Sequence, residues 1–167
     1  MRAIMDGAKR IAFYMHWTSG VLLIVMMVTI LIDVISRAVF GATKGSVDFT
    51  FNGGVEIVSY SLLFCIMFAL PYSVRRGQVI VDLFTGAMSE RLKGILAGIY
   101  TLGFALLGFG MATEFYKATG RLYQSGETTQ DLLIPMFYIF AVATFAAAVL
   151  AVRGVLVAIQ QFIDSGR

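Results

Sequence analysis

Four long stretches without a charged residue constrain what this chain can fold into. They cover residues 11–32, 57–74, 94–113 and 132–152, and each holds 18 to 22 residues. The hydrocarbon core of a bilayer needs about 20 apolar residues of helix, at about 1.5 Å of rise per residue. Each stretch is therefore long enough to cross a membrane once and too short to cross it twice.

The composition supports a membrane location, because 59% of the residues are hydrophobic and only 14% are charged. Soluble domains carry about 45–50% apolar and about 25% charged residues. A backbone in lipid must form its own hydrogen bonds, as helices or closed barrels do. Barrel strands alternate apolar and polar residues, and GVLLIVMMVTILI (20–32) does not. We expect an all-α integral membrane protein, with one domain over 1–167 and four spans at about 11–36, 55–75, 92–115 and 131–155.

The distribution of basic residues predicts the orientation. Nine of the 13 lie in the N-terminus, the loop between the second and third spans, and the C-terminal end; four lie in the other two loops. Cytoplasmic loops are enriched in Lys and Arg. Both termini are therefore expected in the cytoplasm. The net charge of +3 reflects this topology and does not indicate a nucleic-acid partner.

A short segment after the second span is interpreted as lying along the inner membrane surface. Arg75 and Arg76 suit the level of anionic phospholipid headgroups, and Gly77 allows the chain to turn. Residues 79–88 (VIVDLFTGAM) then form a short interfacial helix with its apolar side toward lipid. The alternative is an ordinary loop packed on neighbouring helices. Ser89 is expected to cap the third helix.

Charged and capping residues mark the outer ends of the helices. Asp33 and Arg37 are spaced to pair on one helical face, and Glu56 is expected near the start of the second helix. Two interpretations stay open: a local Asp33–Arg37 pair, or contact of Arg37 and Glu56 with each other or with a partner protein. Thr128 or Thr129 could cap the fourth helix.

Small residues at helical spacing predict close helix packing. Gly94 and Gly98 have GxxxG spacing in the third span, and Ala143, Ala147 and Ala151 repeat every fourth residue in the fourth. Small residues at this spacing let helices in a membrane approach closely. The first span instead carries bulky side chains on all sides, as a helix facing lipid or a large partner would.

The sequence offers no site for enzymatic chemistry. His16, the single histidine, neighbours Trp17 and suits an aromatic belt at the membrane surface. One histidine cannot supply bis-His haem ligation within the chain. No Cys/His cluster, P-loop or HExxH motif occurs. We therefore expect neither an enzyme nor a bound cofactor.

Several stretches, in order along the chain, resemble one family. They are DVISRAVFG (33–41), the segment 53–84 from GGVE to RRGQVIVDLF, SERLKG (89–94) and GETTQDLLIPMFYIF (126–140). Together with the length and topology, they resemble the DctQ-like small membrane subunit of tripartite ATP-independent periplasmic (TRAP) transporters. The resemblance covers nearly the whole chain.

The resemblance implies a bacterial inner-membrane complex with two partners. One is a large elevator-type membrane subunit that carries the substrate and sodium sites. The other is a periplasmic binding protein that delivers an organic acid or a similar small polar solute. The small subunit would be a scaffold, with 79–88 as a brace. Residues expected at partner interfaces are Arg37, Glu56, Arg75, Arg76, Gly77, Asp82 and Phe84.

Two other functions stay open at this point. A small proton-coupled four-helix exporter would need a carboxylate within the membrane, and Glu56 is its candidate, although the sequence places it at a helix start. A membrane anchor of a redox complex would need haem ligands that the chain does not offer.

Overall fold

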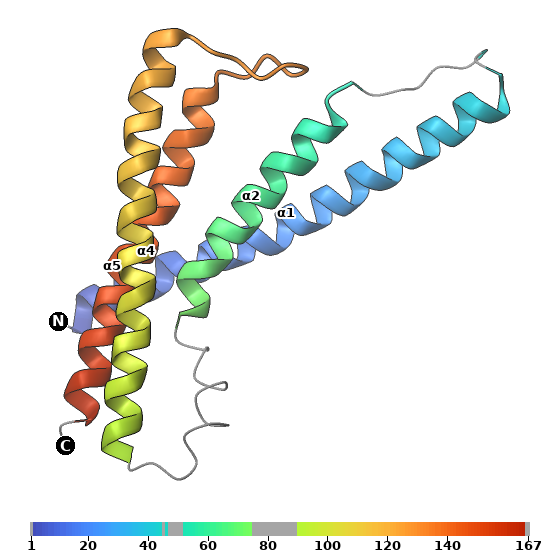
Figure 1. The fold of residues 1–167 in the computed structure, drawn as a ribbon. Helices are drawn as coiled ribbons and strands as arrows, with labels where there is room; N and C mark the ends of the chain where they lie inside the picture. Colours follow the sequence, from blue (N-terminus) through green and yellow to red (C-terminus); the bar gives the residue numbers. More distant parts are fainter. Residues whose placement is uncertain (1, 45, 47–51, 75–89, 166–167) are drawn as a thin grey trace.

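The computed structural model describes residues 2–44, 46, 52–74 and 90–165, and four long helices account for most of these residues (Figure 1). They are α1 (Arg2–Ala42), α2 (Gly54–Ser73), α4 (Glu90–Ser125) and α5 (Met136–Ser165). All four are long and apolar enough to cross a membrane, and the described ranges contain no strand. The predicted all-α fold with four transmembrane helices is confirmed. The cytoplasmic location of the termini stays a prediction.

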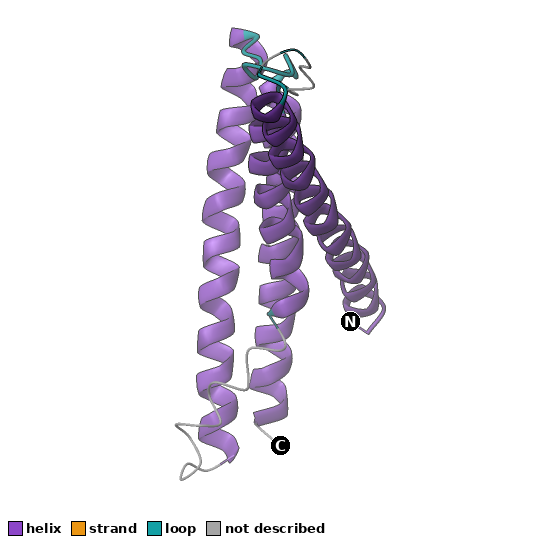
Figure 2. Ribbon diagram, turned by 90° about the vertical axis from the view of Figure 1, so that its right-hand side faces the viewer, coloured by secondary structure: helices purple, strands orange, loops and turns teal. Residues whose placement is uncertain are grey.

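The helices form two antiparallel pairs. α1 packs on α2 and α4 packs on α5, while α5 also contacts α1 and α2. Figure 1 shows that the α1–α2 pair is inclined to the α4–α5 pair, with the two pairs diverging away from the end that holds both termini, and Figure 2, turned by 90°, shows the N-terminal part of α1 to one side of α4 and α5. α5 is therefore the helix that joins the two pairs.

The α4–α5 pair packs closely because both helices carry small residues where they meet. A Cβ atom at Gly108 would lie 2.7 Å from the Ala151 nitrogen and 3.1 Å from the Ala147 oxygen. A Cβ atom at Gly154 would lie 2.9 Å from Ala105 Cα. Real Cβ atoms do not approach backbone this closely, so only glycine fits these two positions at this separation. Such close contact is a main source of helix association in lipid.

The small residues predicted to face a neighbouring helix do so. The Cβ positions of Gly94 and Gly98 point at Ser165 and the Phe162 ring of α5, at 2.5 and 2.7 Å. Ala143 of α5 is 1% exposed. The predicted glycine face of α4 is thus confirmed as part of its contact with α5, and Ala143 is confirmed as buried.

A small apolar core forms where the pairs meet. Met15 of α1, Met67 of α2 and Ala146 and Ala147 of α5 are buried together. Phe68, Met111 and Phe115 are among the partly buried side chains around them. α1 and α2 also meet at Ser19 and Cys65, whose oxygen and sulfur atoms are 3.8 Å apart.

Three of the described helices, α1, α4 and α5, are longer than a bilayer's hydrocarbon thickness. α4 has 36 residues and thus a length of about 54 Å, against about 30 Å of hydrocarbon. It continues past the predicted span of 92–115 and ends at Ser125, and the next residue, Gly126, has a φ of 69°, the left-handed conformation common after helices. The C-terminal part of α4 therefore projects as a polar helix, where a loop had been expected.

Candidate partner interface

Glu56 joins the two helix pairs at their diverging end. Its carboxylate oxygens accept hydrogen bonds from the backbone N–H groups of Asp131 (2.8 Å) and Leu132 (3.1 Å). It also interacts with the Thr129 side chain and the Gln130 backbone. These groups belong to the loop between α4 and α5, which reaches across to the start of α2 in Figure 1. Glu56 therefore connects the start of α2 to this loop through hydrogen bonds, and we call this contact the Glu56 latch.

The loop over 126–135 has a defined shape of its own. The Thr129 N–H donates to the Ile134 oxygen at 2.9 Å, and the Ile134 N–H donates to the Thr129 hydroxyl at 3.1 Å. The Met136 N–H donates to the Glu127 oxygen at 3.0 Å. The expectation that Thr128 or Thr129 caps the last helix is wrong. α5 begins only at Met136, and the Thr129 hydroxyl instead bonds within the loop.

Gly53 allows the loop to reach α2. Its φ of 107° is unfavourable for other residues, and a Cβ atom there would lie 2.8 Å from Leu132 Cδ2. The next residue begins α2, and Glu56 follows in its first turn. The sequence GGVE thus combines the turn, the close contact and the latching carboxylate in four residues.

Arg37 forms the local pair. Its Nε atom lies 2.9 Å from Asp33 Oδ2, and its side chain is 65% exposed. The structure thus places Arg37 with Asp33 and Glu56 with the loop, so these two predicted interface residues do not bind each other. A role for either one toward a partner stays a prediction.

A cluster of aromatic and cationic side chains joins three helices nearer the termini. The His16 ring of α1 stacks on the Tyr72 ring of α2 with 4.9 Å between centroids, and Phe13 meets Tyr72 edge-on at 6.0 Å. Arg153 of α5 places its guanidinium carbon 5.3 Å from the Tyr72 centroid. A cation over an aromatic face is attracted by the ring quadrupole. Tyr72 is thus the common neighbour of α1 and α5.

Sequence reasoning missed the importance of Arg153, which counted only as one basic residue in the orientation argument. Its side chain is 5% exposed, although arginine is almost never fully buried unless paired. One signal was present: VRGVLVAI (152–159) places a single charge inside an otherwise apolar segment. Such a position favours an arginine inside the protein over one at a solvated helix end.

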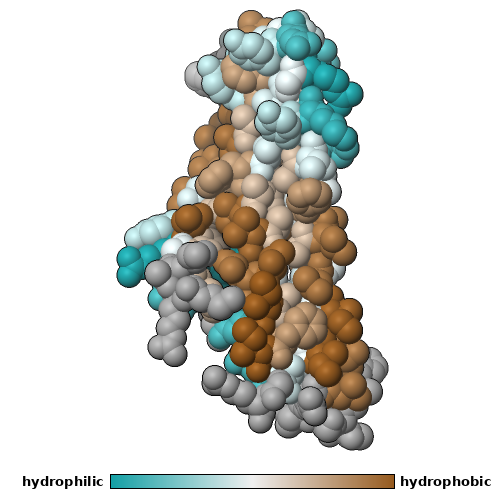
Figure 3. Space-filling model, turned by 90° about the vertical axis from the view of Figure 1, so that its left-hand side faces the viewer, coloured by the Kyte–Doolittle hydropathy of each residue, from teal (hydrophilic) through white to brown (hydrophobic). Residues whose placement is uncertain are grey.

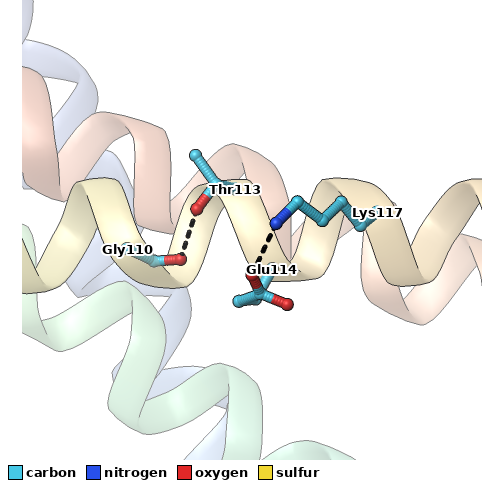
Figure 4. Close-up of polar contacts among 4 residues, drawn as sticks. All are labelled: Gly110, Thr113, Glu114 and Lys117. Atoms are coloured by element: carbon cyan, nitrogen blue, oxygen red, sulfur yellow. Dashed lines mark hydrogen bonds and ion pairs between the residues drawn. The ribbon is translucent and has the colours of Figure 1, made fainter.

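The C-terminal part of α4 carries exposed charges. Lys117 and Glu114 form an ion pair at 2.8 Å with both side chains about two-thirds exposed, and the Thr113 hydroxyl donates to the Gly110 oxygen at 2.8 Å (Figure 4). An exposed pair of this kind contributes little to stability. In Figure 3 a hydrophilic region covers this end, above a mostly hydrophobic band. The molecule thus offers a polar surface at the end away from its termini.

α1 carries the largest unburied apolar surface. Only 6% of its most apolar 18-residue window is buried, against 39% for α5. Trp17, Ile24 and Leu31 are 65%, 56% and 52% exposed. The described residues therefore leave most of α1 available to lipid or to another protein.

The comparison with protein families identifies this architecture. The model for the DctQ component of tripartite ATP-independent periplasmic transporters matches residues 26–164. The chain belongs to this family. Searches of curated proteins and of solved structures gave no significant match.

Membership in the DctQ family makes this chain a membrane subunit of a TRAP transporter. The family is a transporter component and not a class of enzyme, and it implies a complex with a large membrane subunit and a binding protein. The match begins inside α1 and ends one residue before the last residue of α5, so it includes the Glu56 latch and the Tyr72–Arg153 contact. Among the described residues, no group of three His, Cys, Asp or Glu side chains could hold a metal ion.

Several predicted sites lie outside the described residues. They are the interfacial segment 79–88, the helix cap at Ser89, and the interface candidates Arg75, Arg76, Gly77, Asp82 and Phe84. These stay predictions from the sequence.

Proposed function

We propose that this chain is the scaffold of a TRAP transporter in a bacterial inner membrane. It holds a large elevator-type subunit in place while that subunit moves substrate. Transport is sodium-coupled uptake of an organic acid or a similar small polar solute, which a periplasmic binding protein delivers. Sodium and substrate bind to the large subunit, so this chain needs no cofactor.

The exposed apolar surface of α1 supports a scaffold role most directly. Bulky side chains surround this helix, and most of them are exposed over its central turns. The pair α4–α5, by contrast, buries its small residues within the chain. α1 is therefore the helix on which we place the large subunit.

The two ends of the molecule suit the other contacts. The polar end of α4 and the latched loop over 126–135 form the surface proposed to meet the binding protein. At the opposite end, Arg75 and Arg76 are proposed to contact phospholipid headgroups, and 79–88 to act as the brace.

The position of Glu56 favours the scaffold over a proton-coupled exporter. A coupling carboxylate must exchange protons within the membrane, whereas Glu56 lies in the first turn of α2 and binds backbone N–H groups of a loop. A redox anchor has no comparable support, because the single histidine cannot supply two axial haem ligands within the chain.

Photo-crosslinking in the assembled complex tests the scaffold. Benzoylphenylalanine is placed at Ile24 or Leu31 of α1, with Leu107 of α4 as the control at 51% exposure. The large subunit should crosslink to the two α1 positions. Crosslinking of Leu107 alone, or of no position in a complex that still transports, would contradict the proposal.

A further inference from the structure

A polar cavity lies between α1 and α5 near the end that holds the termini. It has a volume of about 190 Å³ and is lined in part by Asp6 and Lys9 of α1 and by Arg153 and Gln160 of α5. Two of these four side chains are cationic and one is anionic. The cavity thus favours a ligand with a negatively charged, hydrogen-bonding group.

An apolar groove adjoins this cavity. It has a volume of about 430 Å³, and only Ala, Leu, Phe and Val side chains line it: Leu102, Ala105, Leu106, Phe109, Ala151, Val152, Val155 and Leu156. Leu156 also lines the polar cavity, so the two spaces are neighbours that share this side chain. A molecule that fills both must be charged at one end and apolar along the rest.

The cavity also lies near the ends of the uncharged stretches of three helices. The uncharged stretch 11–32 begins just after Arg10, the stretch 57–74 ends just after Tyr72, and the stretch 132–152 ends just before Arg153. Tyr72 and Arg153 are in contact, and Lys9 and Arg153 line the same cavity. The groove continues from this level along α4 as far as Phe109.

From this geometry we infer that the chain binds one anionic phospholipid at the junction of α1, α4 and α5. The phosphate occupies the cavity beside Lys9 and Arg153, and an acyl chain lies in the groove over Ala151 and Val155. The lipid thus contacts the N-terminal part of α1 through its headgroup and the α4–α5 pair through its chain. The inference holds whichever side of the membrane the termini face, and it does not depend on the scaffold proposal.

Native mass spectrometry of the purified full-length chain in mild detergent tests the site. The probe is dioleoyl phosphatidylglycerol, compared with dioleoylglycerol, which lacks the phosphate, and with glycerol phosphate, which lacks the chains. Phosphatidylglycerol should remain bound where the other two do not. Lys9→Gln should weaken its binding about fivefold, as expected for one basic residue near an anionic headgroup. Leu102→Trp should weaken binding by obstructing the groove.

Two matched controls separate the site from general lipid affinity. Lys44→Gln removes an exposed charge at the other end of α1, and Leu107→Trp adds the same bulk to α4 outside the groove. Both should bind phosphatidylglycerol like the parent chain. Equal binding of glycerol phosphate would mean a free phosphate site, and equal binding of dioleoylglycerol an apolar groove alone. Either result, or equal losses in the controls, would overturn the inference, as would crosslinking of Leu102 to the large subunit.

Discussion

The contact between α4 and α5 makes a sharp prediction at Gly108. A methyl group there would sit 2.7 Å from the Ala151 nitrogen, and that backbone atom can move only if the whole of α5 shifts. Overpacking a well-packed contact costs about 1–3 kcal/mol. Alanine also gains about 0.5–1 kcal/mol over glycine within a helix. Gly108→Ala should therefore lower the free energy of unfolding by up to about 2.5 kcal/mol.

Gly110 provides the matched control two residues along the same helix. A Cβ atom there meets nothing within 4 Å, so Gly110→Ala should raise the free energy of unfolding by about 0.5–1 kcal/mol. The gain in helix propensity is common to both variants. The difference between them, about 1–3 kcal/mol, thus isolates the packing cost.

Unfolding of the purified chain by sodium dodecyl sulfate in mixed micelles measures this difference, followed by circular dichroism. If Gly108→Ala and Gly110→Ala change the free energy of unfolding alike, α4 and α5 are not in the close contact described. The close contact would be contradicted equally if the Gly108→Ala variant were more stable than the parent chain.

Three further predictions address topology and two polar contacts. A cysteine at Ser125 should react with a membrane-impermeant thiol reagent applied to spheroplasts, and one at Ser89 should not; the reverse labelling would invert the orientation. Thr101→Val should lower the free energy of unfolding by about 0.6–1.7 kcal/mol, since the buried Thr101 hydroxyl donates to Gln161 of α5 at 2.8 Å. An unchanged free energy of unfolding would mean that this hydrogen bond does not stabilise the fold. Glu56→Gln should speed hydrogen exchange several-fold at the amide of residue 131 or 132, because glutamine keeps one accepting oxygen while its NH2 group would face the other N–H donor; unchanged exchange at both amides would rule out the latch.

The fold class could be predicted from the sequence because its signal is local. An uncharged stretch of about 20 residues indicates a membrane helix without any knowledge of what the helix contacts. Glycine and alanine spacing likewise predicted the faces of α4 and α5, since periodicity places Gly94 and Gly98 on one side. The helix ends could be predicted less well, because α4 continues through Lys117 and Arg121 to Ser125, beyond its apolar stretch.

The contacts at both ends could not be predicted, because each joins residues far apart in sequence. Glu56 binds amides 75 and 76 residues away, and backbone N–H groups carry no signature in the sequence. Arg153 meets Tyr72 across two helices for the same reason. The sequence did place Glu56 correctly near the start of a helix. The shape of the loop over 126–135 could not be predicted from the sequence, because it depends on hydrogen bonds within the loop.

The exposure of α1 alone does not demand a protein partner, because lipid tails are as apolar as the side chains that they surround. The arrangement of its two sides is more informative. Met15 and Ser19 are buried on the side toward α2, whereas Trp17, Ile24 and Leu31 recur every seven residues on the opposite side. None of these three is small, so a partner cannot approach α1 as closely as α5 approaches α4. It must instead present a surface into which bulky side chains fit, along one stripe of the helix. A partner bound in this way predicts crosslinks at both Ile24 and Leu31, two turns apart, whereas lipid contact predicts none at either position.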